Sequence, residues 1–241
     1  MSAPAIILAE PQLGENIGAT ARAMANFGLS DLRLVRPRDV WPNPKAQKMA
    51  AGADAILDAA RVFASVKEAV ADLQRVYAAT ARERAMLKEV VTPEEAARRI
   101  RVDAARGARS GILFGAERAG LENDDVALAD FIVAIPVKAE FSSINLAQAV
   151  IITAYEWFKT GDATPPVRFE TEPTRPANKE ELVAFFEHFE RELDGVGFLY
   201  PPEKRPSMVR NLRNMWQRAG LTEQEIRSLR GVITALGKQR K

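Results

Sequence analysis

The stretch EPQLGENIGATARAMANFG, residues 10–28, decides how the whole chain is interpreted. It follows an apolar run over residues 5–9, which is a strand pattern, and it opens a helical pattern. Its glycines, Gly14 and Gly18, match neither the dinucleotide-binding fingerprint nor the nucleotide-binding loop that ends in Lys followed by Ser or Thr. A helix beginning near Asn16 would still offer free N–H groups to an anion. We therefore expect a ligand to bind where this strand meets this helix.

Arg22 lies one helical turn beyond Gly18, on the same face of the predicted helix. Its guanidinium would stand above a patch that the glycine leaves clear, so it suits a phosphate group or a developing oxyanion. The alternative is an exposed helical arginine, with Asn16 as an ordinary helix cap. This stretch alone leaves both interpretations open.

Strand patterns alternate with helical patterns along the first two thirds of the chain. The strand patterns cover residues 5–10, 32–35, 75–80, 111–115 and 131–136. This alternation predicts an α/β domain over residues 1–160, with a largely parallel sheet whose ligands bind at the carboxyl ends of the strands. Residues 161–178 contain four prolines and no apolar periodicity, so we expect a linker there.

Three helical patterns follow in residues 179–241. Asn178 is predicted to cap the first helix and Ser207 the second. Thr222 and Glu225 have the spacing of a capping box for the third. We therefore expect a small helical extension at the C-terminus.

Basic residues are concentrated in this extension. The whole chain has a net charge of only +2, but residues 204–241 contain ten Lys or Arg and two Glu. Such a block is typical of nucleic-acid binding, although a solvated helical surface also explains it. In the second helix, Arg210, Arg213 and Asn214 fall away from the apolar stripe, so their face either meets phosphates or only keeps the helix soluble.

Composition excludes several kinds of site. The chain has 241 residues, no cysteine and a single histidine, which removes disulfides, thiol nucleophiles and thiolate metal sites. We expect no metal ion, and His188, beside an aromatic helical stripe, is assigned no role. Because the N-terminal residues lack a basic start and a long apolar core, we expect a cytoplasmic protein without a membrane partner.

A second motif, GILFGAERAGLEND, occupies residues 111–124. A buried-looking strand runs into Gly115, Glu117, Arg118 and Gly120. Strand ends that turn on glycine often hold ligands. The alternative is a simple turn with Glu117 and Arg118 paired on the surface.

A third motif, FIVAIPVKAEFSSINLAQAVIITAYEWF, occupies residues 131–158. Ser142, Ser143, Asn145 and Gln148 follow the strand and precede an apolar helix that we expect to begin near Ser143. Ser143 would serve as a helix cap in any protein, but the density of small polar groups at this strand end exceeds what a cap needs. The motif therefore adds a third candidate ligand loop.

Taken together, NIGATARAM, LFGAERAGL, and IPV followed by SSINLAQAV resemble the three motifs of the SpoU branch of the SPOUT methyltransferases. The C-terminal LRNMWQRAGLTEQEIRSLRGVITALGKQRK is similar to the tail of the TrmJ-type tRNA 2′-O-ribose methyltransferases. The resemblance implies a C-terminal trefoil knot in the sheet, which periodicity alone does not show. It also implies S-adenosylmethionine as cofactor and a homodimer that binds RNA near the subunit interface.

The resemblance also implies roles for individual residues. The cofactor-binding loops would contain Ala79, Thr80, Ala81, Gly115, Ile135, Ser142, Ser143, Ile144 and Leu146. The catalytic set would be Asn16, Arg22, Glu117, Ser143 and Asn145. Arg22 would also bind RNA, and the polar face of the second C-terminal helix adds Arg210 and Arg213 to the expected RNA-binding residues. Asn16 and Arg22 would address the substrate phosphate and ribose, while Gly18 keeps the approach open. Relatives often have Gly or Thr followed by Ser where this chain has Ala79 and Thr80, so we expect backbone contacts there.

The activity implied is S-adenosylmethionine-dependent 2′-O-methylation of a pyrimidine in the tRNA anticodon loop, at position 32. Arg22 would stabilise the growing alkoxide rather than remove a proton, because a guanidinium stays protonated in proteins. The expected partners are tRNA and a second copy of the chain, not DNA. The alternatives are a methyltransferase of the same fold acting on ribosomal RNA, a non-catalytic RNA-binding protein, and a dinucleotide enzyme, which lacks its glycine fingerprint.

Overall fold

The chain divides into two compact units, Met1–Thr164 and Pro165–Lys241. The computed structural model describes residues 2–80, 87–167 and 174–238. Each unit has a hydrophobic core of its own. Within the described ranges, no helix combines the length and the apolar character that crossing a lipid bilayer requires.

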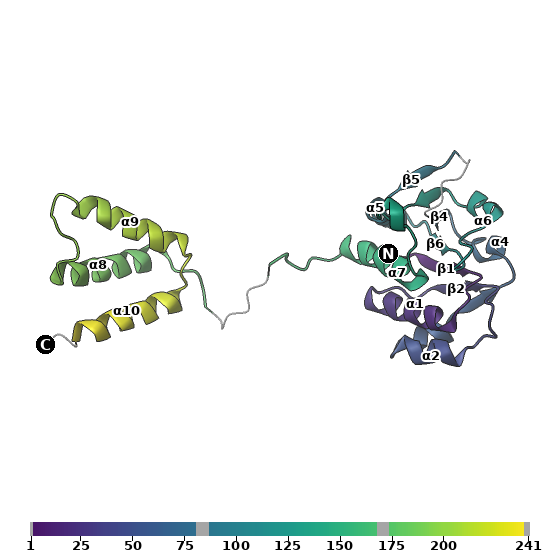
Figure 1. Cartoon of the computed structure of the whole chain (residues 1–241), viewed down its shortest axis with the longest axis horizontal. Coiled ribbons are helices and arrows are strands. Elements are labelled where there is room, and N and C mark those ends of the chain that lie inside the picture. The colour runs from purple at the N-terminus through teal and green to yellow at the C-terminus, as the bar shows by residue number, and fades with distance from the viewer. Residues whose placement is uncertain (1, 81–86, 168–173, 239–241) are drawn as a thin grey trace. The chain divides into compact units, whose positions relative to one another are not determined.

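A parallel sheet forms the centre of the first unit (Figure 1). Among the described residues it has seven strands in the order β3-β2-β1-β6-β4-β7-β5, and every neighbouring pair is parallel. The strands are β1 (Ala5–Ala9), β2 (Leu32–Val35), β3 (Arg61–Phe63), β4 (Arg75–Ala79), β5 (Glu89–Val91), β6 (Ser110–Phe114) and β7 (Phe131–Val133). The five predicted strands are confirmed as β1, β2, β4, β6 and β7. The sequence did not predict β3 and β5, which form the two edges.

Helices cover both faces of this sheet (Figure 1). They are α1 (Gly14–Asn26), α2 (Pro44–Ala50), α3 (Asp54–Asp58), α4 (Val66–Ala69), α5 (Pro93–Ala105), α6 (Asn123–Ala127), the short 3-10 helix η1 (Ala139–Phe141) and α7 (Leu146–Lys159). On one face, Ile6 of β1 belongs to the same buried cluster as Ile17 of α1 and Val150 of α7. On the other face, Ile7 packs in a cluster with Val66 of α4. The α/β fold class with a parallel sheet is confirmed.

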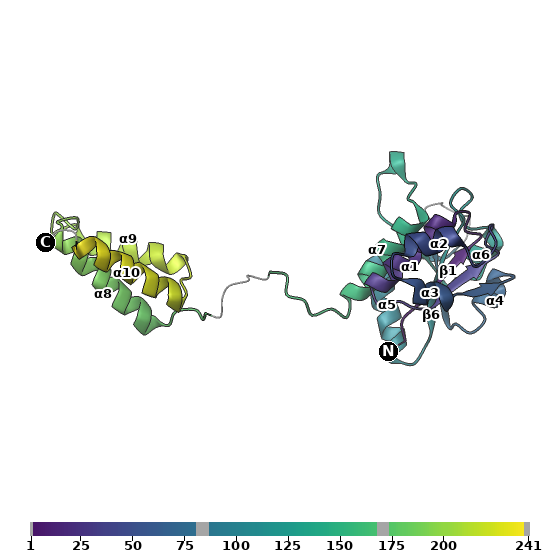
Figure 2. The same cartoon turned by 90° about the horizontal axis from the view of Figure 1, so that it is seen from below.

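Gly18 in α1 allows α2 to pack closely against α1 (Figure 2). A Cβ atom added to Gly18 would lie 2.1 Å from the carbonyl oxygen of Ala46 and 2.8 Å from Cβ of Met49. The expectation that Gly18 leaves a patch clear for a ligand is therefore wrong, because the backbone of α2 occupies that space. The glycine serves packing between two helices.

At the amino ends of the strands, Arg33 of β2 is completely buried. Its guanidinium donates hydrogen bonds to both carboxylate oxygens of Asp31, to Asp72 and to the carbonyl oxygen of Ala69. The hydrogen bond from Arg33 holds the pKa of the Asp72 carboxyl below its ordinary value. The buried positive charge is thus neutralised by two carboxylates: Asp31 directly precedes β2, and Asp72 lies in the turn before β4.

Three predicted helix starts need correction. The helix α1 begins at Gly14 with Leu13 as N-cap, so Asn16 is not its cap. The helix α7 is capped by Asn145 instead of Ser143, since the Asn145 side chain accepts hydrogen bonds from two backbone N–H groups of its first turn. The helix α9 begins before Ser207, whose hydroxyl donates to a carbonyl oxygen of the preceding turn. Of these three helices, α7 alone has a side-chain cap, whereas the N-cap residues of α1 and α9 form no side-chain hydrogen bond with the first turn.

Over residues 174–238, the second unit has three helices that pack side by side (Figures 1 and 2). They are α8 (Lys179–Gly195), α9 (Arg205–Arg218) and α10 (Glu223–Lys238). The predicted cap Asn178 forms a capping box with Glu181, and the predicted pair Thr222 and Glu225 exchanges hydrogen bonds at the start of α10. Phe185 lies at the centre of the core of this unit and is completely buried.

Candidate active site

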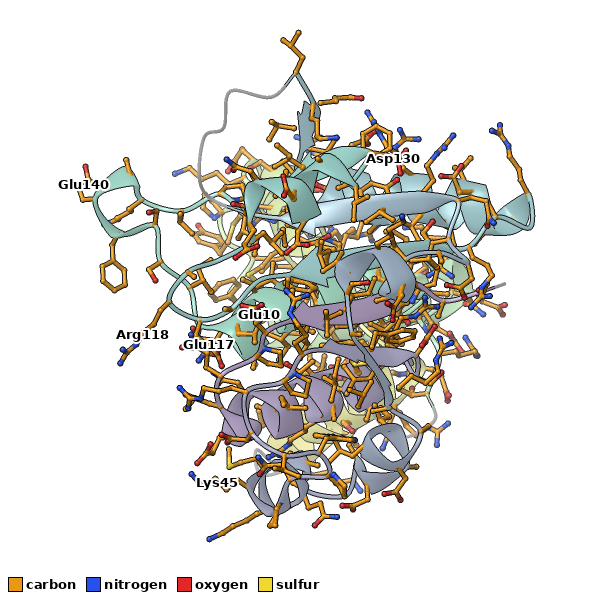
Figure 3. The ribbon with its side chains drawn as sticks, turned by 90° about the vertical axis from the view of Figure 1, so that its right-hand side faces the viewer. Glu10, Lys45, Glu117, Arg118, Asp130 and Glu140 are labelled. Carbon is orange, nitrogen blue, oxygen red and sulfur yellow. The ribbon has the colours of Figure 1, made fainter. Side chains whose placement is uncertain are left out.

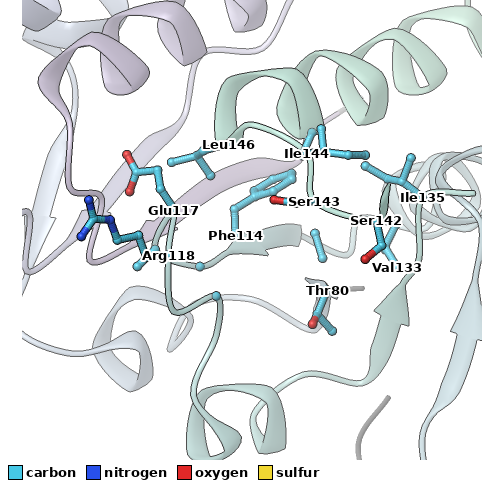
Figure 4. Close-up of a pocket in the computed structure, with 15 residues that line it drawn as sticks. Thr80, Phe114, Glu117, Arg118, Val133, Ile135, Ser142, Ser143, Ile144 and Leu146 are labelled. Carbon is cyan, nitrogen blue, oxygen red and sulfur yellow. The ribbon is translucent and has the colours of Figure 1, made fainter. Parts of the chain in front are cut away.

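A pocket opens at the carboxyl ends of β4, β6 and β7, beside the start of α7 (Figure 4). Its volume is about 280 Å³, near the lower end of the roughly 300–1,000 Å³ typical of small-molecule sites. The residues that line it are Ala79, Thr80, Phe114, Gly115, Ala116, Glu117, Arg118, Gly120, Val133, Ile135, Ser142, Ser143, Ile144, Leu146 and Ala149. The position is the one expected for a ligand site in an open parallel sheet.

The loop after β6 owes its shape to Gly115 and Gly120. A Cβ atom added to Gly115 would lie 2.2 Å from the carbonyl carbon of Gly120, so only glycine allows this approach. Ala116 and Gly120 form an isolated antiparallel bridge, and Gly120 has a φ of 68°, which favours glycine. The loop therefore folds back on itself and presents Glu117 and Arg118 at its tip.

The Glu117 carboxylate turns toward the start of α1 (Figure 4). It accepts hydrogen bonds from the backbone N–H groups of Gln12 at 2.8 Å and Leu13 at 3.1 Å, and from Nδ2 of Asn16 at 2.8 Å. A carboxylate at a helix N-terminus is also favoured by the helix dipole. Glu117 thereby joins the second motif to the first.

Asn145 joins the third motif to the same group. Its Oδ1 accepts hydrogen bonds from the N–H groups of Ala147 and Gln148, so its Nδ2 is left to donate to Oδ1 of Asn16 at 3.0 Å. Asn16 is only 8% exposed, and it donates in turn to Glu117. A continuous chain of hydrogen bonds runs from Asn145 through Asn16 to Glu117, and we call it the asparagine chain.

Arg118 and the loop before α7 both contribute to the lining of the pocket. The Arg118 side chain projects away from the ribbon, and Glu140 lies at the tip of a loop that protrudes from the unit (Figure 3). The alternative of a surface pair between Glu117 and Arg118 is wrong, because Glu117 accepts hydrogen bonds from the start of α1. Within residues 2–80, 87–167 and 174–238, Arg118 has no ion-pair partner. Arg118 therefore offers the pocket an uncommitted positive charge.

The predicted cofactor-binding residues gather around the pocket. Ala79, Thr80, Gly115, Ile135, Ser142, Ser143, Ile144 and Leu146 all line it, whereas Ala81 lies outside the described residues. Sequence reasoning did not name the pocket residues Phe114, Ala116, Arg118, Gly120, Val133 and Ala149 as ligand contacts. Three of the six, Phe114, Ala116 and Arg118, directly adjoin predicted site residues, so their position at the strand end was the available signal.

Arg22 does not line this pocket. It lies on the exposed side of α1, and in the described part of the chain no side chain forms an ion pair with it. Of the predicted catalytic residues, Asn16, Glu117 and Asn145 are brought together by the asparagine chain, and Ser143 lines the pocket. Arg22 alone stands apart from them within one chain.

The two predicted RNA-binding arginines of α9 have different surroundings. Arg210 is exposed. Arg213 instead packs toward α8, where its Nε lies 2.6 Å and its second terminal nitrogen 2.9 Å from the carboxylate oxygens of Glu190. The expectation that Arg213 falls away from the packed face is wrong, because a buried carboxylate on the neighbouring helix holds it there.

Comparisons with known families agree with this geometry. The model of the SpoU rRNA Methylase family matches residues 3–155, which include all three motifs. The model of the tRNA methyltransferase TrmJ C-terminal domain matches residues 180–241.

Individual relatives match nearly the whole chain. The tRNA (cytidine/uridine/adenosine-2′-O-)-methyltransferase TrmJ of Pseudomonas aeruginosa (strain UCBPP-PA14) is 35% identical over 97% of this chain and 93% of its own length. The tRNA (cytidine/uridine-2′-O-)-methyltransferase TrmJ of Yersinia pestis (strain Pestoides F) is 36% identical over 98% and 92%. The crystal structure of TrmJ from Z. mobilis ZM4 has 53% identity and a TM-score of 0.85, and covers 98% of this chain and 100% of its own. The resemblance predicted from the motifs is confirmed: the chain belongs to the SpoU methylase family and, along nearly its whole length, to its TrmJ-type methyltransferases.

Proposed function

We propose that this chain transfers a methyl group from S-adenosylmethionine to the ribose 2′-hydroxyl of a pyrimidine at position 32 in the tRNA anticodon loop. The full-length similarity to tRNA 2′-O-methyltransferases supports the reaction and the substrate class. The observation that carries the proposal in the structure is the asparagine chain, because it ties all three motifs together beside one pocket. The names of the two curated relatives differ on adenosine, so the base modified is part of the test.

The pocket lining suits this cofactor. Ile135, Ile144 and Leu146 offer apolar walls to a flat adenine, while the hydroxyl of Ser142 and the backbone of the loop at Ala79 would hold polar parts. When bound, S-adenosylmethionine supplies an electrophilic methyl group on a sulfonium. Arg118 at the rim would attract the carboxylate of the methionine part.

The chain must align the ribose hydroxyl and stabilise its growing negative charge, since a hydroxyl is a poor nucleophile. We assign the second task to Arg22, which acts by its positive charge while water or phosphate accepts the proton. Asn16, Glu117 and Asn145 would hold the loops in register, and Ser143 would orient the ribose.

A homodimer would bring Arg22 to a pocket. The outer face of α7 exposes Ile151, Tyr155 and Phe158, and the two aromatic rings pack against Phe27 at the end of α1. Exposed apolar residues clustered on one face are typical of a subunit interface. Because α1 packs along α7, a second copy docked there would lie next to the exposed stripe that carries Arg22. Light scattering of the purified chain tests the dimer.

The trefoil knot is part of the same proposal. Its support is the family together with the convergence of β4, β6, β7 and the start of α7 on one pocket. The knot would fix these loops relative to one another before any ligand binds.

The reaction is tested by incubating the purified chain with labelled S-adenosylmethionine and separate pools of unmodified tRNA and ribosomal RNA. Nucleoside mass spectrometry and site mapping then identify the product. We expect a 2′-O-methylated pyrimidine at position 32 of tRNA. Label only in ribosomal RNA would contradict the substrate, and bound cofactor without transfer to either pool would support a binding protein instead.

A further inference from the structure

The loop between α8 and α9 keeps two aromatic rings at the surface. Phe198 is 54% exposed and Tyr200 is 75% exposed, whereas Leu199 between them is 5% exposed. Since a single residue separates the two rings, their Cα atoms are at most about 7 Å apart. The buried leucine anchors the loop while its neighbours face solvent.

Hydrogen bonds fix the conformation of this loop. The N–H groups of Gly197 and Phe198 donate to the carbonyl oxygens of Asp194 and Leu193, each at 3.0 Å. The Arg205 guanidinium donates to both carboxylate oxygens of Asp194, at 3.0 and 2.6 Å. The rings are therefore presented by an ordered loop.

The other large aromatic residues of this unit behave differently. Phe185, Phe186, Phe189 and Trp216 pack against one another, with ring centroids 5.3–5.9 Å apart. Within residues 174–238, neither Phe198 nor Tyr200 packs against another ring. An exposed aromatic pair on an ordered loop is typical of a surface that binds a partner.

The adjoining helix α9 supplies positive charge. Its sequence, RPSMVRNLRNMWQR, contains four arginines and no carboxylate. Arg205 and Arg213 are held by carboxylates of α8. Arg210 and Arg218 are exposed, as is Lys204 at the N-terminal end of the helix, and in the described part of the chain these three have no ion-pair partner.

We propose that the α8–α9 loop and the exposed face of α9 form a binding site for single-stranded RNA. Phe198 and Tyr200 stack on unpaired bases, while Lys204, Arg210 and Arg218 contact phosphates. Stacking platforms beside cationic grooves bind single strands with little regard to sequence, because every base has a π-face. This site deepens the proposed function and rests on it, since it adds affinity for a tRNA loop and leaves the choice of the methylated nucleotide to the pocket.

Charge favours RNA over a second copy of the chain at this surface. At this surface Lys204, Arg210 and Arg218 stand against one exposed carboxylate, Glu203, so two identical surfaces would repel each other. RNA presents phosphates that would pair with these positive charges and unpaired bases that would stack on the two rings.

The test uses the full chain with Phe198→Leu and Tyr200→Leu, which keep an apolar side chain but remove the ring. We expect each to weaken tRNA binding by about tenfold or more. The matched controls are Tyr200→Phe, which keeps the ring, and Val232→Ala on α10, where the valine is 55% exposed. Both controls should bind tRNA like the wild type, and S-adenosylmethionine affinity should be unchanged throughout.

Salt dependence separates stacking from charge. The plot of log affinity against log salt should keep its slope in the leucine variants. In Lys204→Ala, Arg210→Ala or Arg218→Ala, the slope should become shallower by about 0.7 for each phosphate that the variant no longer neutralises. Arg213→Ala does not distinguish the two effects, because its ion pair with Glu190 is structural.

Wild-type tRNA affinity in both leucine variants would overturn the proposal. A change in molecular mass by light scattering in those variants would also overturn it, in favour of a protein interface. If the wild type and controls bind tRNA, the leucine variants do not, and no preparation transfers a methyl group, the stacking site stands and the proposed reaction fails.

Discussion

At the amino ends of the strands, the buried Arg33 guanidinium donates from all three of its nitrogens, chiefly to Asp31 and Asp72. At the carboxyl ends, by contrast, Ser142 and Ser143 line the pocket, and within the described ranges neither hydroxyl has a hydrogen-bond partner. One end of the sheet has used its polar groups to hold strands together. The other end has kept polar groups available, as a binding site requires.

The largest effect is expected at the carboxyl end, from Arg22→Ala. Removing a charge that stabilises the developing alkoxide should lower kcat by about 100- to 1,000-fold. Cofactor affinity and the urea midpoint should not change, because Arg22 is exposed and forms no ion pair with any described residue. Single-turnover kinetics and calorimetry measure these quantities.

The control for Arg22→Ala is Arg106→Ala, which removes an exposed arginine of the same unit outside the pocket lining. It should leave kcat unchanged. An equal loss of cofactor affinity in Arg22→Ala would contradict the assignment of Arg22 to the reacting hydroxyl.

Arg33→Met should lower the stability of the fold and leave cofactor binding unchanged. It removes charge-assisted hydrogen bonds worth roughly 1.5–3 kcal/mol each and leaves Asp31 and Asp72 without their buried partner. We expect the free energy of unfolding to fall by about 2 kcal/mol in urea denaturation, because partial exposure of both carboxylates offsets some of the loss. Cofactor affinity of the folded protein should stay the same.

Arg61→Met is the matched control, since Arg61 contacts the same Asp31 but is 48% exposed. Exposed pairs contribute about 0–1 kcal/mol, so its effect should be much smaller. Equal losses in the two variants would show that burial of Arg33 does not matter.

Asn16→Ala tests whether the asparagine chain contributes both to the stability of the fold and to the rate of methyl transfer. It removes two hydrogen bonds, so we expect a loss of about 1–2 kcal/mol in stability. Since the loops bearing Glu117 and Asn145 lose their link, methyl transfer should also slow by about tenfold. Asn26→Ala, at the exposed end of the same helix, should do neither; a stability loss with unchanged kcat would make the chain purely structural.

The smallest effect concerns acid. A hydrogen bond from Arg33 lowers the pKa of Asp72. For Asp31, burial raises the pKa, but hydrogen bonds from Arg33 and Arg61 together outweigh this effect, so the pKa is lowered overall. Their stabilisation is full above the unfolded value of about 3.9 and is lost as pH falls through the folded pKa values. Urea midpoints between pH 6 and pH 3 should therefore fall less steeply for Asp72→Asn than for the wild type. Parallel curves would contradict this pairing.

The sequence predicted the five interior strands because their buried runs are nearly continuous in apolar residues. The edge strands β3 and β5 escaped prediction since they are three residues long and partly exposed. Arg33 escaped for another reason: a charged residue in a strand pattern is normally placed on the solvent face. Its two carboxylate partners come from separate turns, and pattern reasoning does not pair them.

The sheet topology explains which residues of the candidate site could be predicted from the sequence and which could not. The resemblance implies cofactor-binding residues after β4, β6 and β7, and residues from all three of these strand ends line one pocket. The asparagine chain joins side chains 101 and 129 positions apart, which periodicity does not connect. Gly18 shows the limit most clearly, because a glycine signals close approach without saying whether a ligand or a helix approaches.

The direction of the asparagine chain has a consequence for proton movement. Every hydrogen in it is an amide N–H, pointing from Asn145 to Asn16 and from Asn16 to Glu117. Both oxygens of Glu117 already accept such hydrogens. Amide groups are very weak acids, so this chain of hydrogen bonds does not conduct protons. The proton that leaves the ribose must exit toward solvent or the RNA itself, and deuterium solvent effects on methyl transfer should be insensitive to Asn145→Ala.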